Sequence, residues 1–488
     1  MDKRTKIIAT ISDKRCEVEF IRSLYEAGMN AVRINTAHVT TRSAATIVEN
    51  VRRVSEKIAI IIDTKGPEIR LTGMAAGFES GIPIEKGQLV RMKGTAEDRP
   101  SSDQTIYLND PTIYDAVPTG SIILIDDGEL ELQVVDKADN ELVCEVHNGG
   151  VIKPRKSVNI PGVPIDLPSV TDKDHEFINW AIDMDIDFIA HSFVRKKSDV
   201  LAVKKILKDR NSSIKIISKI ENSEGVDNID EILDETYGIM VARGDLGVEI
   251  PAERIPVTQR LLVKKCIESK KPVIIATQML HTMIEHPRPT RAEISDVANA
   301  IYQRVDAVML SGETANGLYP VEAVATMARV AREIENDEVN NGPNIDMNLV
   351  RINNEITAQL ARSAVRASIN LRVKAIVIDT LSGRTGRYVA AFRGQMPVYA
   401  VCYRKSTMRQ LALSYGVHAI YCEPSVREGF LLNILYYLED RKWLSKEDLI
   451  VVLGGSFGAA TGASFLEIGN VLNLEHKALS QYNAYRKD

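Results

Sequence analysis

Eight short apolar runs, separated by helical patterns, constrain the fold of this chain more than any other feature. They begin at Lys6, Ala31, Ile58, Asp187, Lys215, Gly238, Pro272 and Ala307. Alternation of strand and helix is typical of a parallel sheet, and eight such units close a (β/α)8 TIM barrel. Nearly every run ends in polar or charged residues, so we expect an active site at the carboxyl ends of the strands.

The alternation is interrupted after the third run and changes again near the end of the chain. Residues 71–165 contain short alternating segments between Gly, Pro and Asp turns, which predict a small β domain acting as a lid. After Asn336 the sequence NNGPNIDMN predicts a linker, and further strand-like runs follow at Ala375, Val398, Ala419 and Leu449. The predicted domains are a barrel of residues 1–70 and 166–338, a lid of 71–165 and a C-terminal α/β domain of 339–488.

The composition excludes several functional classes. A net charge of −5, with no basic stripe among aromatic residues, argues against a nucleic-acid binder. No run reaches the ~18 apolar residues that a spanning helix needs, and no signal peptide is recognisable, so we expect a cytoplasmic protein that does not enter a membrane. Five scattered cysteines, and eight histidines without HExxH spacing, predict neither disulfides nor a zinc site.

Charged residues follow two consecutive predicted strands. Lys219 and Glu221 are two residues apart, so in an extended strand their side chains lie on one face. Arg243 and Asp245 follow the next strand. Carboxylates beside cations suit a hard divalent cation held next to phosphate oxygens. An isolated Lys-x-Glu is more simply a surface ion pair, but its recurrence on neighbouring strands favours the cation site.

Eight motifs occur in order along the chain. They are RINTAH at Arg33, DTKGPEIR at Asp63, IAHSFV at Ile189, ISKIEN at Ile217, MVARGDLGVE at Met240, ATQML at Ala276, PTRAEISDVANA at Pro289 and MLSGETANGLYP at Met309. In these motifs the chain resembles the pyruvate kinase family. The resemblance implies a TIM barrel with an inserted β-barrel lid domain and a C-terminal α/β domain. It also implies transfer of the phosphoryl group of phosphoenolpyruvate to ADP, giving pyruvate and ATP in glycolysis.

The resemblance assigns catalytic roles to Lys219, Thr277, Ser311 and Arg33, and it assigns two carboxylates as metal ligands. Glu221 and Asp245 match the ligands of Mg²⁺ or Mn²⁺, and Lys219 matches the lysine that stabilises the phosphoryl group in flight. These roles suit phosphoryl transfer, which depends on positioning and charge neutralisation. Thr277 and Ser311 match hydroxyls of a relay that protonates the enolate, and a water chain is needed because threonine is a poor acid. Either hydroxyl could instead satisfy the backbone at a strand end.

Substrate and nucleotide contacts are carried over in the same way. The substrate-binding set is Arg33, Lys219, Gly244, Asp245 and Thr277, with the Gly244 N–H directed to the substrate carboxylate. The nucleotide-binding set is Asn35, His38, Arg70 and Lys156. Asp127 matches a lid aspartate that approaches the substrate on closure, or is simply a turn residue. The chain has no GxxxxGK[ST] sequence, so it does not bind nucleotide through a P-loop.

The potassium site that the resemblance implies is incomplete. The family binds K⁺ with an asparagine, a serine, an aspartate and a threonine carbonyl; Asn35, Asp63 and Thr64 match, but Ala37 stands in the serine position. Thr36 cannot substitute, because neighbouring residues of an extended strand face opposite ways. We expect a K⁺ site that persists with water in place of the hydroxyl and binds more weakly.

Other departures lie near the site. Residues 12–15 replace a usual Gly-Pro loop near the nucleotide. His281 follows ATQML, and Gln303 and Arg304 precede Asp306, where the family usually differs. The sequence alone does not give the effect of these changes.

The loop TLSGRTG in the predicted C-terminal domain places hydroxyls and a glycine before a helical pattern, as in a phosphate nest. The family uses this loop for a sugar-phosphate effector. The matching residues are Thr380, Ser382, Gly383, Arg384 and Thr385. The alternative is a capped helix start without a ligand. The segment GGSFGAATG differs from the family's usual sequence and leaves a sugar phosphate or a nucleotide open as the effector.

Three functions compete. The first is an active pyruvate kinase, a homotetramer by resemblance, which binds phosphoenolpyruvate, ADP or ATP, and pyruvate. The second is a sensor or scaffold that binds phosphorylated metabolites, supported only by the changes at residues 12–15 and Ala37. The third is a barrel lyase, against which the lid and the nucleotide residues count. Joint retention of Lys219, Glu221, Asp245 and Thr277 favours catalysis.

Overall fold

The computed structural model describes residues 3–340, 346–424, 429–455 and 462–485. Eight parallel strands form a closed barrel in the order β1-β16-β15-β14-β13-β12-β3-β2. Every predicted run contributes a strand, which confirms the TIM barrel. The strands are β1 (Lys6–Thr10), β2 (Ala31–Asn35), β3 (Ala59–Asp63), β12 (Phe188–His191), β13 (Lys215–Ile220), β14 (Gly238–Ala242), β15 (Val273–Ala276) and β16 (Ala307–Leu310).

Helices cover the outside of the barrel, so its strands are buried on both faces and read as continuous apolar runs. Three helices begin at capping boxes, in which the hydroxyl of Thr40, Thr171 or Thr290 accepts a backbone N–H and the N3 side chain bonds back. The helices are α1 (Val18–Ala27), α2 (Thr41–Val54), α4 (Asp172–Asp183), α5 (Lys197–Asp209), α6 (Ser223–Asp227), α7 (Ile229–Glu235), α8 (Arg243–Glu249), α9 (Ile255–Glu268), α10 (Arg291–Tyr302), α11 (Gly312–Ala315) and α12 (Pro320–Asn340), with short 3₁₀ turns at Ala252–Arg254 and His281–Ile284.

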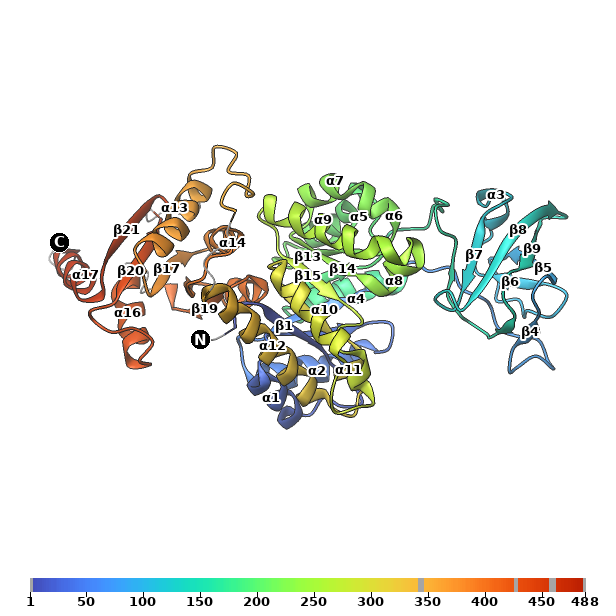
Figure 1. The fold of residues 1–488 in the computed structure, drawn as a ribbon, viewed down its shortest axis with the longest axis horizontal. Coiled ribbons are helices and arrows are strands. Elements are labelled where there is room, and N and C mark those ends of the chain that lie inside the picture. The colour runs from blue at the N-terminus through green and yellow to red at the C-terminus, as the bar shows by residue number, and fades with distance from the viewer. Residues whose placement is uncertain (1–2, 341–345, 425–428, 456–461, 486–488) are drawn as a thin grey trace.

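The predicted β insertion is present and lies at one end of the molecule (Figure 1). Six strands form a sheet in the order β11-β7-β8-β9-β5-β6 and two more pair as β10-β4; within residues 71–165 neither sheet closes into a ring. The insertion has a hydrophobic core of its own. Its elements are β4 (Ile82–Ile84), β5 (Leu89–Gly94), β6 (Ile106–Leu108), α3 (Ile113–Ala116), β7 (Ile122–Ile125), β8 (Leu130–Ala138), β9 (Glu141–Val146), β10 (Gly150–Ile152) and β11 (Val158–Asn159).

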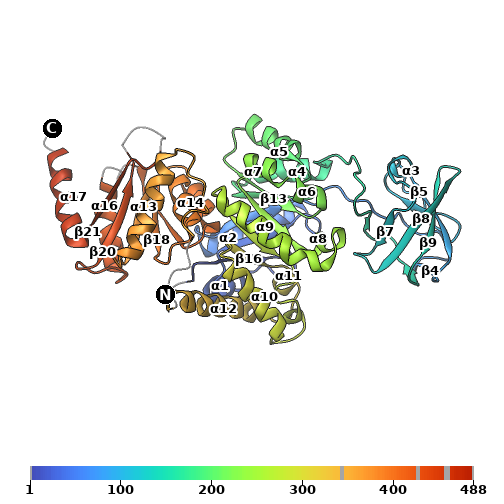
Figure 2. The same cartoon turned by 45° about the horizontal axis from the view of Figure 1, so that its top comes forward.

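The C-terminal region forms the predicted α/β layer structure at the opposite end (Figure 2). Its sheet has the order β19-β18-β17-β20-β21, and β21 is antiparallel to β20. The sequence does not predict β21, because its residues are largely exposed and form no apolar run. The elements are α13 (Ile356–Asn370), β17 (Ala375–Thr380), α14 (Arg384–Ala391), β18 (Val398–Cys402), α15 (Lys405–Gln410), a 3₁₀ turn (Leu411–Leu413), β19 (Val417–Tyr421), α16 (Phe430–Asp440), β20 (Leu449–Gly454), β21 (Phe465–Asn470) and α17 (Val471–Tyr485).

The C-terminal region packs against the amino ends of the barrel strands. Arg393 donates to both carboxylate oxygens of Asp306, at 2.6 and 2.5 Å, and Arg409 Nε lies 2.5 Å from Asp187 Oδ1. Asp187 and Asp306 immediately precede β12 and β16. A continuous cluster of buried apolar side chains joins barrel and C-terminal region, whereas the core of the insertion is separate.

The domain boundaries at residues 70/71, 165/166 and 338/339 remain predictions. Most of the predicted linker, residues 341–345, lies outside the described residues. None of the helices in the described part of the chain combines the length and the apolar character needed to cross a membrane.

Candidate active site

Lys219, Glu221 and Asp63 form a buried charged cluster at the carboxyl ends of β13 and β3. Lys219 Nζ lies 2.8 Å from Glu221 Oε1 and 3.1 Å from Asp63 Oδ1. Arg33, on β2, places its Nε 2.5 Å from Asp63 Oδ2. Lys219 and Glu221 therefore meet on one side of the strand, as their two-residue spacing predicts.

Burial and neighbouring charges set the protonation states of this cluster. Burial opposes ionisation of Lys219, but Asp63 and Glu221 outweigh it and raise the pKa of the lysine. Burial would raise the pKa of Asp63, but Arg33 and Lys219 hold it below its usual range. At Glu221, burial raises the pKa, Lys219 opposes the rise, and the negative charge of Asp245 adds to it. Lys219 therefore stays cationic, while the charge on Glu221 is incompletely compensated.

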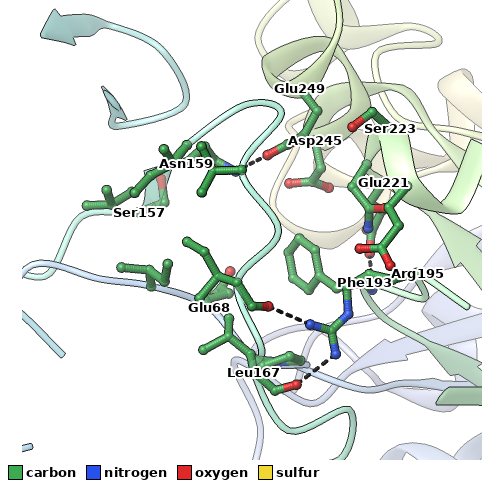
Figure 3. Close-up of a pocket in the computed structure, with 18 of the residues that line it drawn as sticks. Glu68, Ser157, Asn159, Leu167, Phe193, Arg195, Glu221, Ser223, Asp245 and Glu249 are labelled. Atoms are coloured by element: carbon green, nitrogen blue, oxygen red, sulfur yellow. Dashed lines mark hydrogen bonds between the residues drawn. The ribbon is translucent and has the colours of Figure 1, made fainter. Parts of the chain in front are cut away.

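Glu221 and Asp245 are the candidate ligands for a divalent cation. Asp245 lies in the first turn of α8, and both side chains line the same cavity (Figure 3). Glu221 Oε1 is buried and accepts no hydrogen bond of good geometry from the described residues. In that part of the chain no three His, Cys, Asp or Glu side chains gather around a metal position. Two carboxylates with room for water and phosphate fit Mg²⁺ better than a metal enclosed by protein alone.

Ser192, just after β12, is a member of the cluster that sequence reasoning missed. Its hydroxyl accepts a hydrogen bond from Lys219 Nζ at 2.8 Å and donates to the Thr64 carbonyl at 2.7 Å. It therefore links Lys219 to a residue of the predicted K⁺ site. The sequence feature that could have identified Ser192 as a site residue was its place in the motif IAHSFV.

Thr277 has an unusual backbone conformation. Its φ is +67° and that of Gln278 is +54°, values that strain a β-branched residue in particular. Thr277 Oγ1 accepts the Gly244 N–H at 2.8 Å and donates to the Ala276 carbonyl at 2.7 Å. Arg243 donates to the Thr277 carbonyl at 2.7 Å. The Gly244 N–H, expected to bind the substrate carboxylate, is thus bonded to Thr277 in this structure.

Ser311 is the N-cap residue of α11. Its N–H donates to Glu313 Oε2 at 2.8 Å, and Glu313 Oε1 accepts the Leu280 N–H at 3.1 Å. The Ser311 hydroxyl is buried and has no hydrogen-bond partner among the described residues. The structure therefore holds this loop through the backbone and leaves the hydroxyl available.

A cavity of about 620 Å³ separates the insertion from the barrel (Figure 3). Arg70, Asp127 and Lys156 line it from the insertion side, opposite Glu221 and Asp245. Lys156 Nζ pairs with Asp126 at 2.7 Å, and Arg70 Nε with Glu68 at 2.7 Å. Asp127 Oδ1 accepts the Ser157 hydroxyl at 2.9 Å, and the Asp127 φ of +55° marks a tight turn.

The remaining nucleotide and K⁺ candidates are not among the residues that line the cavity, and they differ in exposure. Asp63 and Thr64 are buried, Asn35 is half-buried, and Ala37 and His38 are exposed. Asn35 Oδ1 accepts the Ala37 N–H at 3.0 Å. His38 is not among the residues that line the cavity.

Two contacts between the insertion and the barrel were not predicted. Arg195 donates to the Ile165 and Leu167 carbonyls, at 2.8 and 2.7 Å, and so holds the segment that returns from the insertion. Asn159 donates to Glu249 Oε1 at 3.4 Å. Burial raises the pKa of Glu249, which lies on the cavity wall. Only the motif MVARGDLGVE pointed to Glu249.

The candidate effector loop lies between β17 and α14. The helix predicted after it is confirmed and begins at Arg384. Gly383 has a φ of +78°, and its N–H donates to Thr380 Oγ1 at 3.0 Å. Ser382 is exposed and Thr385 is buried, while Arg384 pairs with Glu355 at 2.7 Å. Of GGSFGAATG, residues 456–461 lie outside the described residues.

Two of the other departures make structural contacts. Arg304 Nε pairs with Glu338 at 3.2 Å, and Gln303 Oε1 accepts a hydrogen bond from Gln259 at 3.1 Å. In residues 12–15, Ser12 donates to the Ala315 carbonyl at 2.8 Å. These side chains therefore brace the outer helices and loops.

Comparison with known proteins gives consistent matches along the chain. Residues 2–324 match the family described as "Pyruvate kinase, barrel domain" and residues 358–468 match "Pyruvate kinase, alpha/beta domain". A pyruvate kinase of Borreliella burgdorferi is 44% identical over 484 residues, covering 96% of this chain and 98% of the relative. Those of Geobacillus stearothermophilus and Bacillus licheniformis are 44% and 43% identical over 475 residues, covering 96% of this chain and 80% of each relative.

Proposed function

Because this chain belongs to the pyruvate kinase family, we propose that the cavity between insertion and barrel is its site of phosphoryl transfer. The family transfers the phosphoryl group of phosphoenolpyruvate to ADP and yields pyruvate and ATP in glycolysis, and this chain is a phosphotransferase of that kind. The observation that carries the assignment of the site is the buried cluster of Lys219, Glu221 and Asp63.

Lys219 stabilises the phosphoryl group as charge develops on its equatorial oxygens. Asp63, Glu221 and the Ser192 hydroxyl hold the ammonium group in place before substrate binds, so little reorganisation is needed during the reaction. Arg33, held by Asp63, supplies a second cation for the phosphate.

Glu221 and Asp245 would hold Mg²⁺ or Mn²⁺, which neutralises the charge of the phosphate and the enolate. Asn35, Asp63 and Thr64 would hold K⁺. Asp63 already bonds to Arg33 and Lys219, so K⁺ would share a carboxylate that two cations engage.

Protonation of the enolate goes through Thr277, Ser311 and water. The Thr277 hydroxyl is fixed by Gly244 and Ala276, and the Ser311 hydroxyl has no partner in the described residues. Ordered hydroxyls of this kind position a water chain, since neither is acidic enough to donate alone.

Arg70 and Lys156 bind the nucleotide as the insertion closes, with Asn35 and His38 on the barrel side. Arg70 and Lys156 already face the cavity. The separate core of the insertion allows it to move as one body.

Assembly, regulation and location are further parts of the proposal. Val257, Leu261 and Tyr302 are 66%, 43% and 48% exposed on one side of the barrel, which supports a homotetramer. The loop from Thr380 to Thr385 takes a sugar phosphate or a nucleotide as effector. The cytoplasm, as the compartment of glycolysis, is the proposed location.

The test is pyruvate formation from phosphoenolpyruvate, ADP and Mg²⁺ by the native chain and by Lys219→Ala. We expect turnover to fall by about 10² to 10³, with a smaller change in KM, because the lysine acts mainly in the transition state. Lys6→Met removes another buried lysine, whose Nζ bonds to the Val417 carbonyl at 2.7 Å, and should leave kcat nearly unchanged. A native chain that binds phosphoenolpyruvate without turnover would support a sensor instead.

A further inference from the structure

A second cavity, of about 1020 Å³, lies at the amino ends of the barrel strands, beside the C-terminal region. Helix α5, the start of β13, the segments just before β14 and β15, and helix α14 contribute to its wall. Figure 2 shows α14 on the side of the C-terminal region that faces the barrel. Six of the residues that line the cavity are basic: Lys204, Lys205, Lys208, Lys215, Lys271 and Arg387. This concentration stands out in a chain whose net charge is −5.

Most of this positive charge is not neutralised. The acidic residues of the lining are Asp209 and Glu235, and Glu235 is engaged by Lys204 at 2.6 Å and by Lys197 at 2.9 Å. Within the described chain, the other five basic residues of the lining have no carboxylate within 4.0 Å.

The innermost cations are partly buried and repel one another. Burial, then Arg387 and Lys204, lower the pKa of Lys271 to about 8, and burial, then Arg387, lower the pKa of Lys215. The Arg387 guanidinium lies over the Tyr237 ring, 4.6 Å from its centroid. Its Nε is buried and has no hydrogen-bond partner among the described residues. Lys215, Lys271 and Arg387 therefore form a positively charged inner wall, and Lys204, Lys205 and Lys208 are exposed around it.

We propose that this cavity is a binding site for a small phosphate-bearing anion, distinct from the active site and from the loop at Thr380. Lysines and a planar guanidinium are the side chains that bind phosphate best. The volume exceeds that of a lone phosphate, and Leu201 and Ile214 supply apolar wall for the rest of the ligand.

The position of the site separates it from the active site. Lys215 begins β13 and Lys219 lies near the opposite end of the same strand. Lys271 precedes β15, which leads into Thr277, and Arg387 comes from the C-terminal region. A bound anion would therefore contact barrel and C-terminal region together and stabilise their association.

The experiment is isothermal titration of the full chain with inorganic phosphate, with a nucleoside monophosphate and with a hexose monophosphate. We expect saturable binding of at least one, and the order of their affinities identifies the ligand class. Lys215→Gln should weaken binding about tenfold, and Lys208→Gln, at an exposed helix position where folding is not at risk, should weaken it measurably.

Matched controls decide where the anion binds. Lys57→Gln removes a lysine that precedes another barrel strand at the same end, outside the cavity, and should bind as the native chain does. Lys219→Ala should also retain binding. No saturable binding of any probe, equal weakening by Lys57→Gln, or loss only in Lys219→Ala would overturn the proposal.

Discussion

The two ends of the barrel strands use buried charge in opposite ways. At the amino end, Asp306 accepts two bonds from Arg393 and the backbone N–H groups of Val273 and Tyr415, at 2.5 to 3.0 Å. At the carboxyl end, Glu221 Oε1 lies 2.8 Å from Lys219 Nζ without a hydrogen bond of good geometry, and the Ser311 hydroxyl has no hydrogen-bond partner in the described chain. The Asp306 carboxylate is therefore fully engaged by protein groups, whereas the groups at the carboxyl end keep capacity for ligands.

Left-handed backbone occurs at both ends of the barrel strands. Thr277 and Gln278, after β15, lie in the left-handed region, but so do Asp185, Lys270 and Arg304, in the segments that lead into β12, β15 and β16. Among these residues Thr277 is β-branched, so the positive φ strains it most, and the surrounding structure holds it there. Satisfied ion pairs gather where two parts of the chain must stay together. The comparison therefore predicts stability effects at one end and activity effects at the other.

The largest effect should come from Asp306→Asn at the amino end. This change leaves the Arg393 guanidinium buried with a weaker partner, and breaking a buried pair costs about 3 to 5 kcal/mol. We expect a lower urea midpoint with kcat of the folded enzyme unchanged. Asp183→Asn breaks an exposed pair with Arg210 and should cost less than about 1 kcal/mol. Equal urea midpoints for Asp306→Asn and Asp183→Asn would show that the buried ion pair at the amino end does not stabilise the fold more than an exposed pair does.

Thr277→Val at the carboxyl end should show the reverse pattern. Valine keeps the shape but removes the acceptor of the Gly244 N–H and the hydroxyl of the relay. We expect kcat to fall about a hundredfold with a small loss of stability, measured by pyruvate formation and by thermal unfolding. Thr277→Ser keeps the hydroxyl and should retain most of the activity. Similar losses in both variants would mean that backbone shape at this position, and not the hydroxyl, matters.

His418, on β19 near the amino end, should make stability depend on pH. Burial, and then Lys6, Lys3 and Lys57, lower its pKa to about 3, against about 6.5 in an unfolded chain. As the pH falls below 6.5, the histidine binds a proton in the unfolded state but not in the folded state. The free energy of unfolding therefore decreases progressively down to about pH 3. At pH 5 the loss is about 2 kcal/mol.

Replacement of this histidine should make the free energy of unfolding depend less on pH at acid pH. His418→Gln should lose less stability than the native chain between pH 7 and pH 5, measured by urea unfolding. His175→Gln removes an exposed histidine and should follow the native profile. Parallel profiles for native chain and His418→Gln would contradict the assigned burial effect.

The smallest effect should come from Ala37→Ser at the carboxyl end. A serine hydroxyl would supply the fourth ligand of the proposed K⁺ site and should lower the K⁺ concentration for half-maximal activity by about threefold to tenfold. The measurement is a K⁺ titration of pyruvate formation, with Ala37→Gly as a variant that adds no hydroxyl. A native chain with no response to K⁺ would show that the site is absent.

The eight barrel strands, the β insertion and four C-terminal strands could be predicted from the sequence. Periodicity and polar strand ends are local properties, and burial on both faces makes the barrel runs continuously apolar. The contact of Lys219 with Glu221 was predictable for the same reason, since strand geometry alone puts residues two apart on one face. Strand β21 was missed because its half-exposed residues carry no such signal.

Partners far apart in the chain were decided only by the tertiary structure. Ser192 reaches Lys219 because β12 and β13 are neighbours, and the Gly244 N–H turns to Thr277 because β14 and β15 are. The basic cavity joins Lys215 of the barrel to Arg387 of the C-terminal region. The sequence by itself determined which elements form and which residues end them. Packing decided which groups meet, because contact energies between distant residues exist only once the chain has folded.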